Sequence, residues 1–170
     1  MRQESYYRGY EVKTPKIYNT VILDSLTEIQ KYCMYQLMGV DIEEAQIDIE
    51  PDSPEWKEWG KSAEMIRLLV RKFRDLPMHV IFVCSRKEDQ DEVKRRIFTP
   101  NMPGKLANEV QGFIDHVGYL STDINEARQL IRFLAFQPGK TYQAKNRFSD
   151  FNEIGILEPT MQKIYNLEIQ

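Results

Sequence analysis

The chain has few cysteines, no long apolar run and no apolar core of a signal peptide near its first residue. Its 170 residues include only two cysteines, Cys33 and Cys84, and both lie in apolar runs. We therefore expect buried free thiols in a reducing compartment rather than a disulfide. No apolar run approaches the length of a membrane span. The sequence thus predicts a cytoplasmic protein without a membrane partner.

An excess of charge of one sign is also missing. The chain has 23 basic and 26 acidic residues, so its net charge is −3. This balance excludes a global attraction to nucleic acid, and any basic surface must be local. Internal repeats and low-complexity tracts are absent, and the length suffices for one domain with a full core. We expect a lead-in segment over residues 1–18 and one α/β domain over residues 19–170.

Residues 19–28 are the most informative stretch. Val21–Leu23 is a short branched apolar run, typical of a strand buried on both faces, and it ends on Asp24. Ser25 and Glu28 then have the spacing of a capping box. A carboxylate that ends a parallel strand lies at the ligand edge of an open α/β sheet, where nucleotide hydrolases hold Mg²⁺. The alternative is that Asp24 only caps a helix, and these residues alone leave both interpretations open.

Two helices are expected next. Apolar residues at spacings of three and four predict a helix that ends at Gly39. The acidic stretch 40–52 is interpreted as a loop. A second helix is expected to start at Asp52-Ser53-Pro54 and to end before Pro77. Its two tryptophans are expected in the core: Trp56 and Trp59.

Met78–Cys84 is a second continuous apolar strand. Strand, helix, helix and strand without a hairpin turn imply a parallel pair joined by a crossover. Ser85 follows this strand at the same sheet edge as Asp24. His79 lies at the start of the strand, the wrong end for chemistry, and is interpreted as structural. Further along, we expect a helix over residues 106–115 and a third strand of the sheet over residues 117–120.

Arg86–Pro103 is interpreted as a long charged loop that leaves the sheet at the ligand edge. Basic residues with an aromatic residue among them suit a phosphate backbone and a stacked base. Acidic residues are interleaved with them, so a solvated loop is the alternative. The candidate DNA-binding residues are Lys87, Lys94, Arg95, Arg96 and Phe98.

The last part of the chain is expected to hold a β-hairpin and a short helix. Residues 130–136 and 141–145 flank Gln137-Pro138-Gly139-Lys140, which predicts a hairpin with a Pro-Gly turn. Lys145 and Arg147 place two cations at its end. The short helix is expected after Pro159.

A phosphate loop, Gly-x-x-x-x-Gly-Lys-Ser/Thr, is missing from the sequence. Gly60-Lys61-Ser62 has the right ending but lies inside the second expected helix. Gly139-Lys140-Thr141 also ends correctly, yet the first glycine is replaced by Leu134, and the hairpin explains the Pro-Gly pair better. A degenerate loop at Lys140 is kept as a weaker hypothesis.

Several segments of the chain, taken in sequence order, resemble the RecA-like nucleotide-binding ATPases of bacteriophages. These are known as phage AAA-domain or Sak-type single-strand annealing proteins. The likeness covers about residues 18 to 165. The similar segments are Val21–Glu28, Trp56–Gly60, Leu76–Val80, Pro103–Glu109, Val117–Leu120 and Ala144–Arg147.

The resemblance implies a RecA-like P-loop core with a mostly parallel sheet, ATP and Mg²⁺ as cofactors, and a role in phage DNA recombination or replication on single-stranded DNA. Asp24 is then the Mg²⁺-side carboxylate, and Ser85 lies near the position that senses the γ-phosphate. Glu28 matches the family's run as well, although helix capping explains it. Lys145 and Arg147 resemble the basic pair that reaches a neighbour's nucleotide, which implies a homo-oligomer.

The chain departs from the family in lacking the phosphate-loop strand and helix, which come before the Asp24 segment in family members. The resemblance places that strand between Val21–Leu23 and Met78–Cys84, so its absence predicts a gap in the sheet, unless a different strand order closes it. We therefore expect the C-terminal part of a longer or split ATPase, and as its partner either a second copy or a chain that supplies the missing phosphate loop. The alternative is a non-catalytic interaction module that binds a partner chain or DNA without hydrolysing ATP.

Overall fold

The computed structural model describes residues 18–40, 54–90, 93–147 and 155–166, together with the backbone of residues 5–7 and 10–12. The elements in chain order are β1 (Ser5–Tyr7), β2 (Tyr10–Val12), β3 (Thr20–Asp24), α1 (Leu26–Met38), α2 (Trp56–Arg74), β4 (His79–Val83), β5 (Arg86–Gln90), β6 (Arg96–Pro100), α3 (Leu106–Phe113), β7 (His116–Val117), β8 (Tyr119–Ile124), β9 (Leu130–Ala135), β10 (Lys145–Asn146), β11 (Gly155–Leu157) and α4 (Met161–Asn166). The acidic stretch expected as a loop lies, from residue 41 on, outside the described residues.

Strands β3 and β4 form the parallel pair that the sequence predicts, with α1 and α2 as the crossover. Their register runs from Thr20 opposite His79 to Asp24 opposite Val83. The two strands are hydrogen-bonded directly to each other, so the expected gap between them is wrong. In the described residues the strands form five small sheets, of which β3–β4 is the parallel one. This is compatible with an α/β protein but is not a mostly parallel RecA-like sheet.

Helix α1 has both of the ends that the sequence predicts. The Ser25 side chain accepts a hydrogen bond from the Glu28 backbone N–H at 3.3 Å, which satisfies one of the free amides of the first turn. Gly39 ends the helix in the left-handed conformation, φ 69°, and its N–H and the next one return to carbonyls of the last turn. Local chemistry therefore fixes the residues over which α1 extends.

Helix α2 differs from its prediction in its start and in its tryptophans. It begins at Trp56 with Glu55 as the capping residue, whose backbone N–H donates to Glu58 at 2.7 Å. Asp52 and Ser53 lie outside the described residues. Trp56 is 94% exposed and Trp59 38% exposed, so their assignment to the core is wrong. The buried face of α2 begins one turn later, at Ser62, because the core lies against its middle and C-terminal part.

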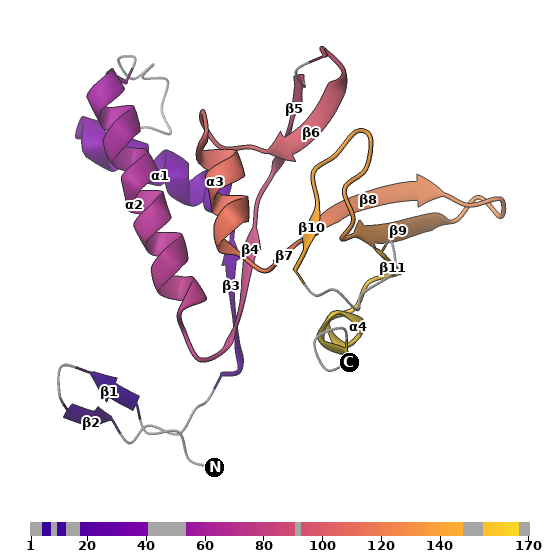
Figure 1. Ribbon diagram of the computed structural model, residues 1–170, viewed down its shortest axis with the longest axis horizontal. Coiled ribbons are helices and arrows are strands. Elements are labelled where there is room, and N and C mark those ends of the chain that lie inside the picture. The colour runs from indigo at the N-terminus through magenta and orange to yellow at the C-terminus, as the bar shows by residue number, and fades with distance from the viewer. Residues whose placement is uncertain are drawn as a thin grey trace.

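The core lies between the three larger helices and one face of the β3–β4 pair (Figure 1). Its buried members come from α1, α2, α3 and the segment before α3: Leu26, Ile66, Val70, Met102, Leu106, Ala107 and Val110. Phe82 and Cys84 of the β4 segment pack against this cluster. On the opposite face of the pair, Ile22 stays 55% exposed and Val83 37% exposed. In the described part of the chain, α1, α2 and α3 thus cover one face of the parallel pair, and α4 contacts the pair only at its start, through Tyr165.

The segment expected as a long charged loop is an antiparallel hairpin. Strand β5 pairs with β6, with Arg86 opposite Pro100 and Gln90 opposite Arg96. Arg96 forms an ion pair with Glu88 at 2.7 Å across the two strands. Opposite charges on facing strands stabilise such a ribbon without an apolar alternation, which is why the pattern of the sequence did not indicate strands.

Two further pairings differ from the sequence prediction. Strand β8 pairs with β9, and β7 pairs with β10, so residues 117–120 do not extend the parallel sheet. Strand β9 therefore does not form a hairpin with residues 141–145. Its six-residue register with β8 is closed by Asn125, whose side chain accepts from the Gln129 N–H at 2.9 Å. The turn that follows β8 is thus closed by an asparagine side chain.

Helix α4 follows Pro159, as the sequence predicts, and lies among the C-terminal strands, across the β3–β4 pair from α1 and α2 (Figure 1). The Tyr165 hydroxyl is 2.6 Å from the Thr20 hydroxyl, and its ring lies 4.5 Å from that of His79. His79 therefore has the structural role expected for it. In the described part of the chain, none of the helices has the length and apolar character needed to cross a membrane.

Candidate nucleotide-binding edge

Asp24 is the last residue of β3, and its side chain is exposed at the carboxyl edge of the parallel pair. Ser85 follows the end of β4 and is exposed at the same edge. The register that sets Asp24 opposite Val83 brings the two candidate residues to neighbouring strand ends. The peptide bond between Asp24 and Ser25 is cis. This shared edge is the one at which open α/β sheets bind ligands.

Thr27 ties α1 to this edge, and sequence reasoning missed it. Its hydroxyl accepts a hydrogen bond from the Ser85 backbone N–H at 3.1 Å and lies 3.2 Å from the Cys84 sulfur. Burial raises the pKa of the Cys84 thiol, although the bond to Thr27 lowers it in part. The partly buried thiol packs against the core cluster. The sequence did offer a signal for Thr27, namely a hydroxyl side chain in the first helical turn after the capping Ser25.

Glu28 lies in the first turn of α1, and its carboxylate is exposed. Its backbone N–H makes the capping bond to Ser25, so the capping explanation given for this position has a contact in the structure. A carboxylate in the first helical turn also interacts favourably with the helix dipole. Its possible role with a nucleotide remains a prediction.

Lys145 and Arg147 lie at the end of α3 rather than with the residues of the Asp24 edge. The Lys145 ammonium donates to the carbonyl oxygens of Gln111 at 3.0 Å and Ile114 at 2.9 Å. Arg147 forms an exposed ion pair with Asp115 at 2.6 Å. Lys145 thus satisfies carbonyls that a helix end leaves without partners. Both cations thus have partners within this chain, and their contact with a neighbour's nucleotide stays a prediction.

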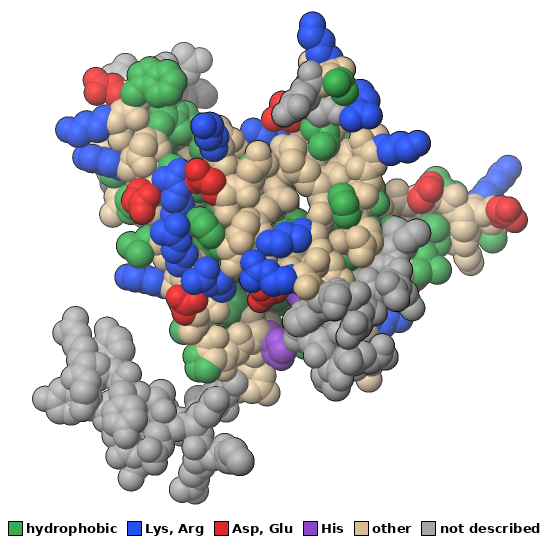
Figure 2. All heavy atoms as spheres, in the orientation of Figure 1, with side chains coloured by type: hydrophobic (Ala, Val, Ile, Leu, Met, Phe, Trp, Pro, Cys, Tyr) green, Lys and Arg blue, Asp and Glu red, His purple; other side chains and the backbone are tan. Residues whose placement is uncertain are grey.

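The β5–β6 hairpin starts directly after Ser85 and carries the candidate DNA-binding cations. Figure 2 shows Lys and Arg side chains gathered on this hairpin. Lys94 and Arg95 are exposed beside the turn. Lys87 is half-buried and donates to the Met102 carbonyl at 2.9 Å, and Arg96 is paired with Glu88. The hairpin tip thus carries two exposed cationic side chains, Lys94 and Arg95.

Phe98 belongs to an aromatic stack at the base of the hairpin. Its ring is stacked on Tyr119 at 6.0 Å between centroids, and Tyr119 is stacked on Tyr142 at 4.5 Å. The guanidinium groups of Arg86 and Arg96 lie 4.4 and 5.0 Å from the Phe98 ring centre. Phe98 thus has an aromatic ring and two guanidinium groups of its own chain as neighbours, and its contact with DNA stays a prediction.

The edge that carries Asp24 offers a carboxylate for Mg²⁺ but no phosphate loop for the triphosphate. Magnesium takes one or two carboxylates together with phosphate oxygens, and Asp24 supplies one exposed carboxylate. Among the described residues, no three His, Cys, Asp or Glu side chains lie close enough to form a metal site by themselves. Gly60 lies inside α2, and Gly139 lies in a turn whose N–H donates to Tyr142. An extended segment and not a helix follows Lys140, so neither stretch forms a phosphate loop.

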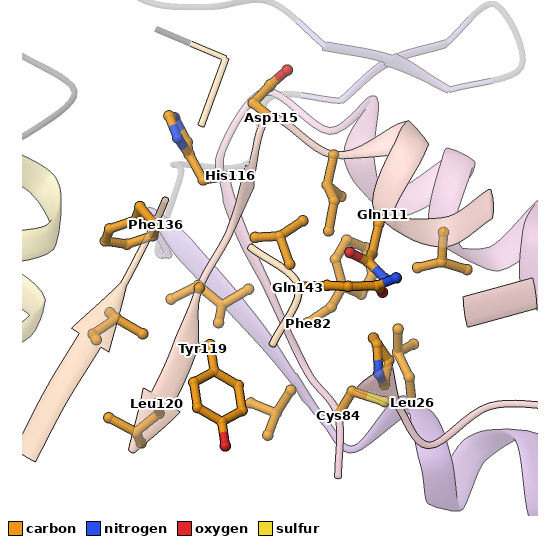
Figure 3. Close-up of a pocket in the computed structure, with 18 of the residues that line it drawn as sticks. Leu26, Phe82, Cys84, Gln111, Asp115, His116, Tyr119, Leu120, Phe136 and Gln143 are labelled. Atoms are coloured by element: carbon orange, nitrogen blue, oxygen red, sulfur yellow. The ribbon is translucent and has the colours of Figure 1, made fainter. Parts of the chain in front are cut away.

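A groove of about 850 Å³ runs along the side of β4 that faces away from β3. Figure 3 shows Phe82 and Cys84 on one side of it and Tyr119 and Phe136 on the other. Gln143 reaches into it and accepts a hydrogen bond from Gln111 at 2.7 Å. The groove therefore separates the parallel pair from the C-terminal strands.

Residues 8–148 match the sequence profile of a family described as AAA domain. The match covers most of the chain, and the chain belongs to this family. Neither the comparison with curated proteins nor the comparison with solved structures gave a match. Membership indicates a nucleotide-binding, ATPase-like protein, and the family generally uses ATP and Mg²⁺.

Proposed function

We propose that the chain is part of a nucleotide-dependent ATPase that acts on single-stranded DNA in recombination or replication, with a phosphate loop that another polypeptide supplies. In this proposal Asp24 contributes the carboxylate on the Mg²⁺ side. Ser85, held by Thr27, faces the terminal phosphate. The protein works as an oligomer or as a complex with the partner chain.

One observation carries the proposal. Asp24 ends a parallel strand beside the end of β4, in a chain that belongs to the AAA-domain family. Family membership favours a nucleotide, and the exposed carboxylate at the ligand edge supports a metal-bound triphosphate at Asp24. The basic β5–β6 hairpin starts at the same edge, so a DNA strand bound there would lie next to the nucleotide.

The first test is equilibrium binding of a fluorescent ATP analogue to the full chain, with and without Mg²⁺. We expect weak, saturable, Mg²⁺-dependent binding that Asp24→Ala weakens by about tenfold, which corresponds to about 1.4 kcal/mol. Asp123→Ala, at an exposed carboxylate of β8, is the matched control and should leave binding unchanged. Equal binding by wild type and Asp24→Ala would remove Asp24 from the nucleotide site.

The DNA part of the proposal predicts a salt-sensitive interaction. Lys94 and Arg95 together should contribute about 2 phosphate contacts, so the double change to Ala should reduce the slope of log affinity against log salt by about 1.4 on single strands. A titration of labelled oligonucleotide at several salt concentrations measures this slope. An unchanged slope would exclude the hairpin tip as the contact.

A non-catalytic interaction module is the second candidate, and the missing phosphate loop favours it. Such a module would bind a partner chain or DNA but would show no Mg²⁺-dependent binding of the ATP analogue. A folded chain that fails to bind the analogue, by itself and with a phosphate-loop peptide, would support the module and overturn the ATPase proposal.

A further inference from the structure

In the described part of the chain, β8 is the outermost strand of the sheet β11–β9–β8. The Asn125 N–H donates to the Gln129 carbonyl at 3.0 Å, which fixes the residues at which β8 and β9 are hydrogen-bonded. Because residues of an antiparallel pair alternate between bonded and unbonded positions, Ser121 and Asp123 bond to β9. The N–H and C=O groups of the alternate residues point to the outer edge of the sheet: Leu120, Thr122 and Ile124.

This outer edge has none of the features that protect natural edge strands from pairing. Proteins usually shorten such strands, place lysine or proline in them, or interrupt them with a bulge. Strand β8 is six residues long, contains neither proline nor lysine, and pairs with β9 in a continuous register. Figure 1 shows the β8–β9 hairpin extending away from the helices. The edge of β8 is therefore open to another strand.

One face of the same hairpin carries exposed apolar side chains. Ile124 lies opposite Leu130 in the register, and Leu120, four residues before Ile124, lies on the same face. Ile124 is 66% exposed, Leu130 57% and Leu120 56%. Large apolar side chains that gather on one face of a projecting hairpin favour a contact with protein.

We propose that β8 pairs antiparallel with β8 of a second copy, about a two-fold axis at Thr122. The contact joins two three-stranded sheets into one sheet of six strands. Leu120 then bonds to Ile124 of the second copy, and Thr122 bonds to its own counterpart, which gives about six backbone hydrogen bonds in all. On the apolar face, Leu130 and Ile124 of one copy continue into Leu120 of the other.

The sequence of β8 selects this register among those that the outward backbone groups allow. With the axis at Thr122, Ser121 faces Asp123 of the second copy, whose carboxylate accepts a hydrogen bond from the serine hydroxyl. With the axis at Asp123, two carboxylates would face each other, and like charges directly opposite destabilise a strand pair. With the axis at Ser121, Ile124 would face Gly118, and the apolar rows across the sheet would be interrupted.

A second copy of β8 fits this edge better than β11 of another molecule. Strand β11 has three residues, so it would leave half of β8 unpaired. Such a head-to-tail contact would also continue into an open chain of molecules, whereas the two-fold contact closes on itself. Because the paired strands run in opposite directions, the two molecules lie at opposite ends of a ribbon about 20 Å long, which keeps their helices apart.

Sedimentation velocity of the full chain, without nucleotide or DNA, tests the contact. We expect a reversible monomer–dimer equilibrium at concentrations between about 1 μM and about 1 mM, as for small and transient interfaces. A chain that stays monomeric across this range would overturn the proposal. Species that grow beyond the dimer with rising concentration would overturn it too, because the contact would then be head-to-tail.

A proline at the axis tests the backbone bonds. Thr122→Pro removes an outward N–H and no bond to β9, so it should weaken dimerisation at least about tenfold. Thr122→Val keeps the N–H and the shape of the side chain, and as the matched control it should change dimerisation less than about threefold. Equal dimerisation by the two variants would exclude the outer edge of β8 as the contact.

A charge on the apolar face gives a second test that leaves the backbone intact. Ile124→Lys should weaken dimerisation about tenfold, because its ammonium group would face Leu120 of the second copy. Leu157→Lys is the control, since Leu157 is 57% exposed on the other face of the sheet. Circular dichroism checks that each variant is folded. If both lysine variants dimerise like the wild type, the apolar rows are not part of the contact and the proposal fails.

Disulfide trapping tests the position of the axis. In the proposed register the two Thr122 Cα atoms are about 5.5 Å apart, within reach of a disulfide, and the two Asp123 Cα atoms are about 8 Å apart, beyond it. Oxidised glutathione should therefore cross-link the Thr122→Cys variant at least about tenfold faster than the Asp123→Cys variant. The wild type, with Cys33 buried and Cys84 partly buried, is the control. Equal rates, or the opposite order, would overturn the axis at Thr122.

The contact goes beyond the proposed function, because none of these measurements uses a nucleotide or DNA. Dimerisation through β8 of a chain that fails to bind the ATP analogue would keep the contact and overturn the proposed function. Mg²⁺-dependent binding of the analogue by a chain that stays monomeric would keep the nucleotide site and overturn the contact.

Discussion

Hydrogen bonding separates the polar residues that stabilise the fold from those that are available to a ligand. Lys145 looked like a site residue in the sequence, yet its ammonium group donates to two carbonyls at the end of α3. Asp24 keeps an exposed carboxylate at the sheet edge. The first residue is therefore a candidate for a stability defect and the second for a binding defect.

Lys145→Met keeps the length of the side chain and removes its charge and its donors. We expect a loss of about 1–3 kcal/mol in the free energy of unfolding, since two helix-end carbonyls lose a charged partner. Urea unfolding followed by circular dichroism measures the loss. Lys140→Met, at an exposed lysine, is the control. An unchanged midpoint for Lys145→Met would mean that this bond does not hold the end of α3.

Residues with local partners could be predicted from the sequence, and residues with distant partners could not. Ser25 and Gly39 act within one helical turn, so spacing alone was enough to assign them. Thr27 acts on Ser85, 58 positions away, and Lys145 acts on Gln111, 34 positions away. No pattern along the chain encodes such a contact, because only the folded backbone brings the partners together.

Among the elements, α2 shows how a helical stripe can exceed the core that it covers. The apolar spacing of its sequence is continuous from Trp56 onward, but the first buried residue is Ser62, nearly two turns later. The length of a stripe is set by the sequence, whereas the covered part is set by what packs against it. Helix α2 was therefore predicted correctly as a helix and wrongly at its tryptophans.

Two substitutions in α2 test this division. Trp56→Ala should change the free energy of unfolding by less than about 0.5 kcal/mol, because the side chain is almost fully exposed. Ile66→Ala, in the centre of the core, should cost about 2–5 kcal/mol. Guanidinium chloride unfolding of both variants gives the comparison. A large loss for Trp56→Ala would show that this tryptophan is packed in solution.

Strand partners were harder to predict than strands. Leu130–Ala135 was expected to be a strand and is one, but it pairs with β8 and β11 instead of the segment after Pro138. Pairing depends on which turn closes first and on which register buries more apolar surface. The sequence of the charged β5–β6 hairpin lacks the alternation of apolar and polar residues that indicates strands. Its ion pair between Arg96 and Glu88 is evident only in the structure.

At the scale of the whole molecule, α4 joins the end of the described chain to its beginning. Tyr165 contacts Thr20 through its hydroxyl and His79 through its ring. The parallel pair is thereby held at its starting edge by α4 and at its carboxyl edge by Thr27. The groove along β4 lies between these two fixed ends.

Tyr165→Phe and Tyr165→Ala separate the two contacts of this residue. The first should cost about 0.5–1.5 kcal/mol through the lost hydrogen bond, and the second should cost more because the ring leaves His79 as well. Thermal unfolding measures both, with Tyr18→Phe at an exposed tyrosine as the control. Equal melting temperatures for wild type and both variants would show that α4 does not stabilise the pair.

The contact between Thr20 and Tyr165 also has a consequence for the order of assembly during protein synthesis. The two residues are 145 positions apart, which at 5–20 residues per second is a delay of roughly 7–30 s on the ribosome. Strands β3 and β4, with α1 and α2, are complete well before α4 emerges. Because Ile164 and Tyr165 line one end of the groove, that end is the last part of the groove to be synthesised. This end of the groove is therefore more accessible in the nascent chain, before α4 has been synthesised, than in the complete protein.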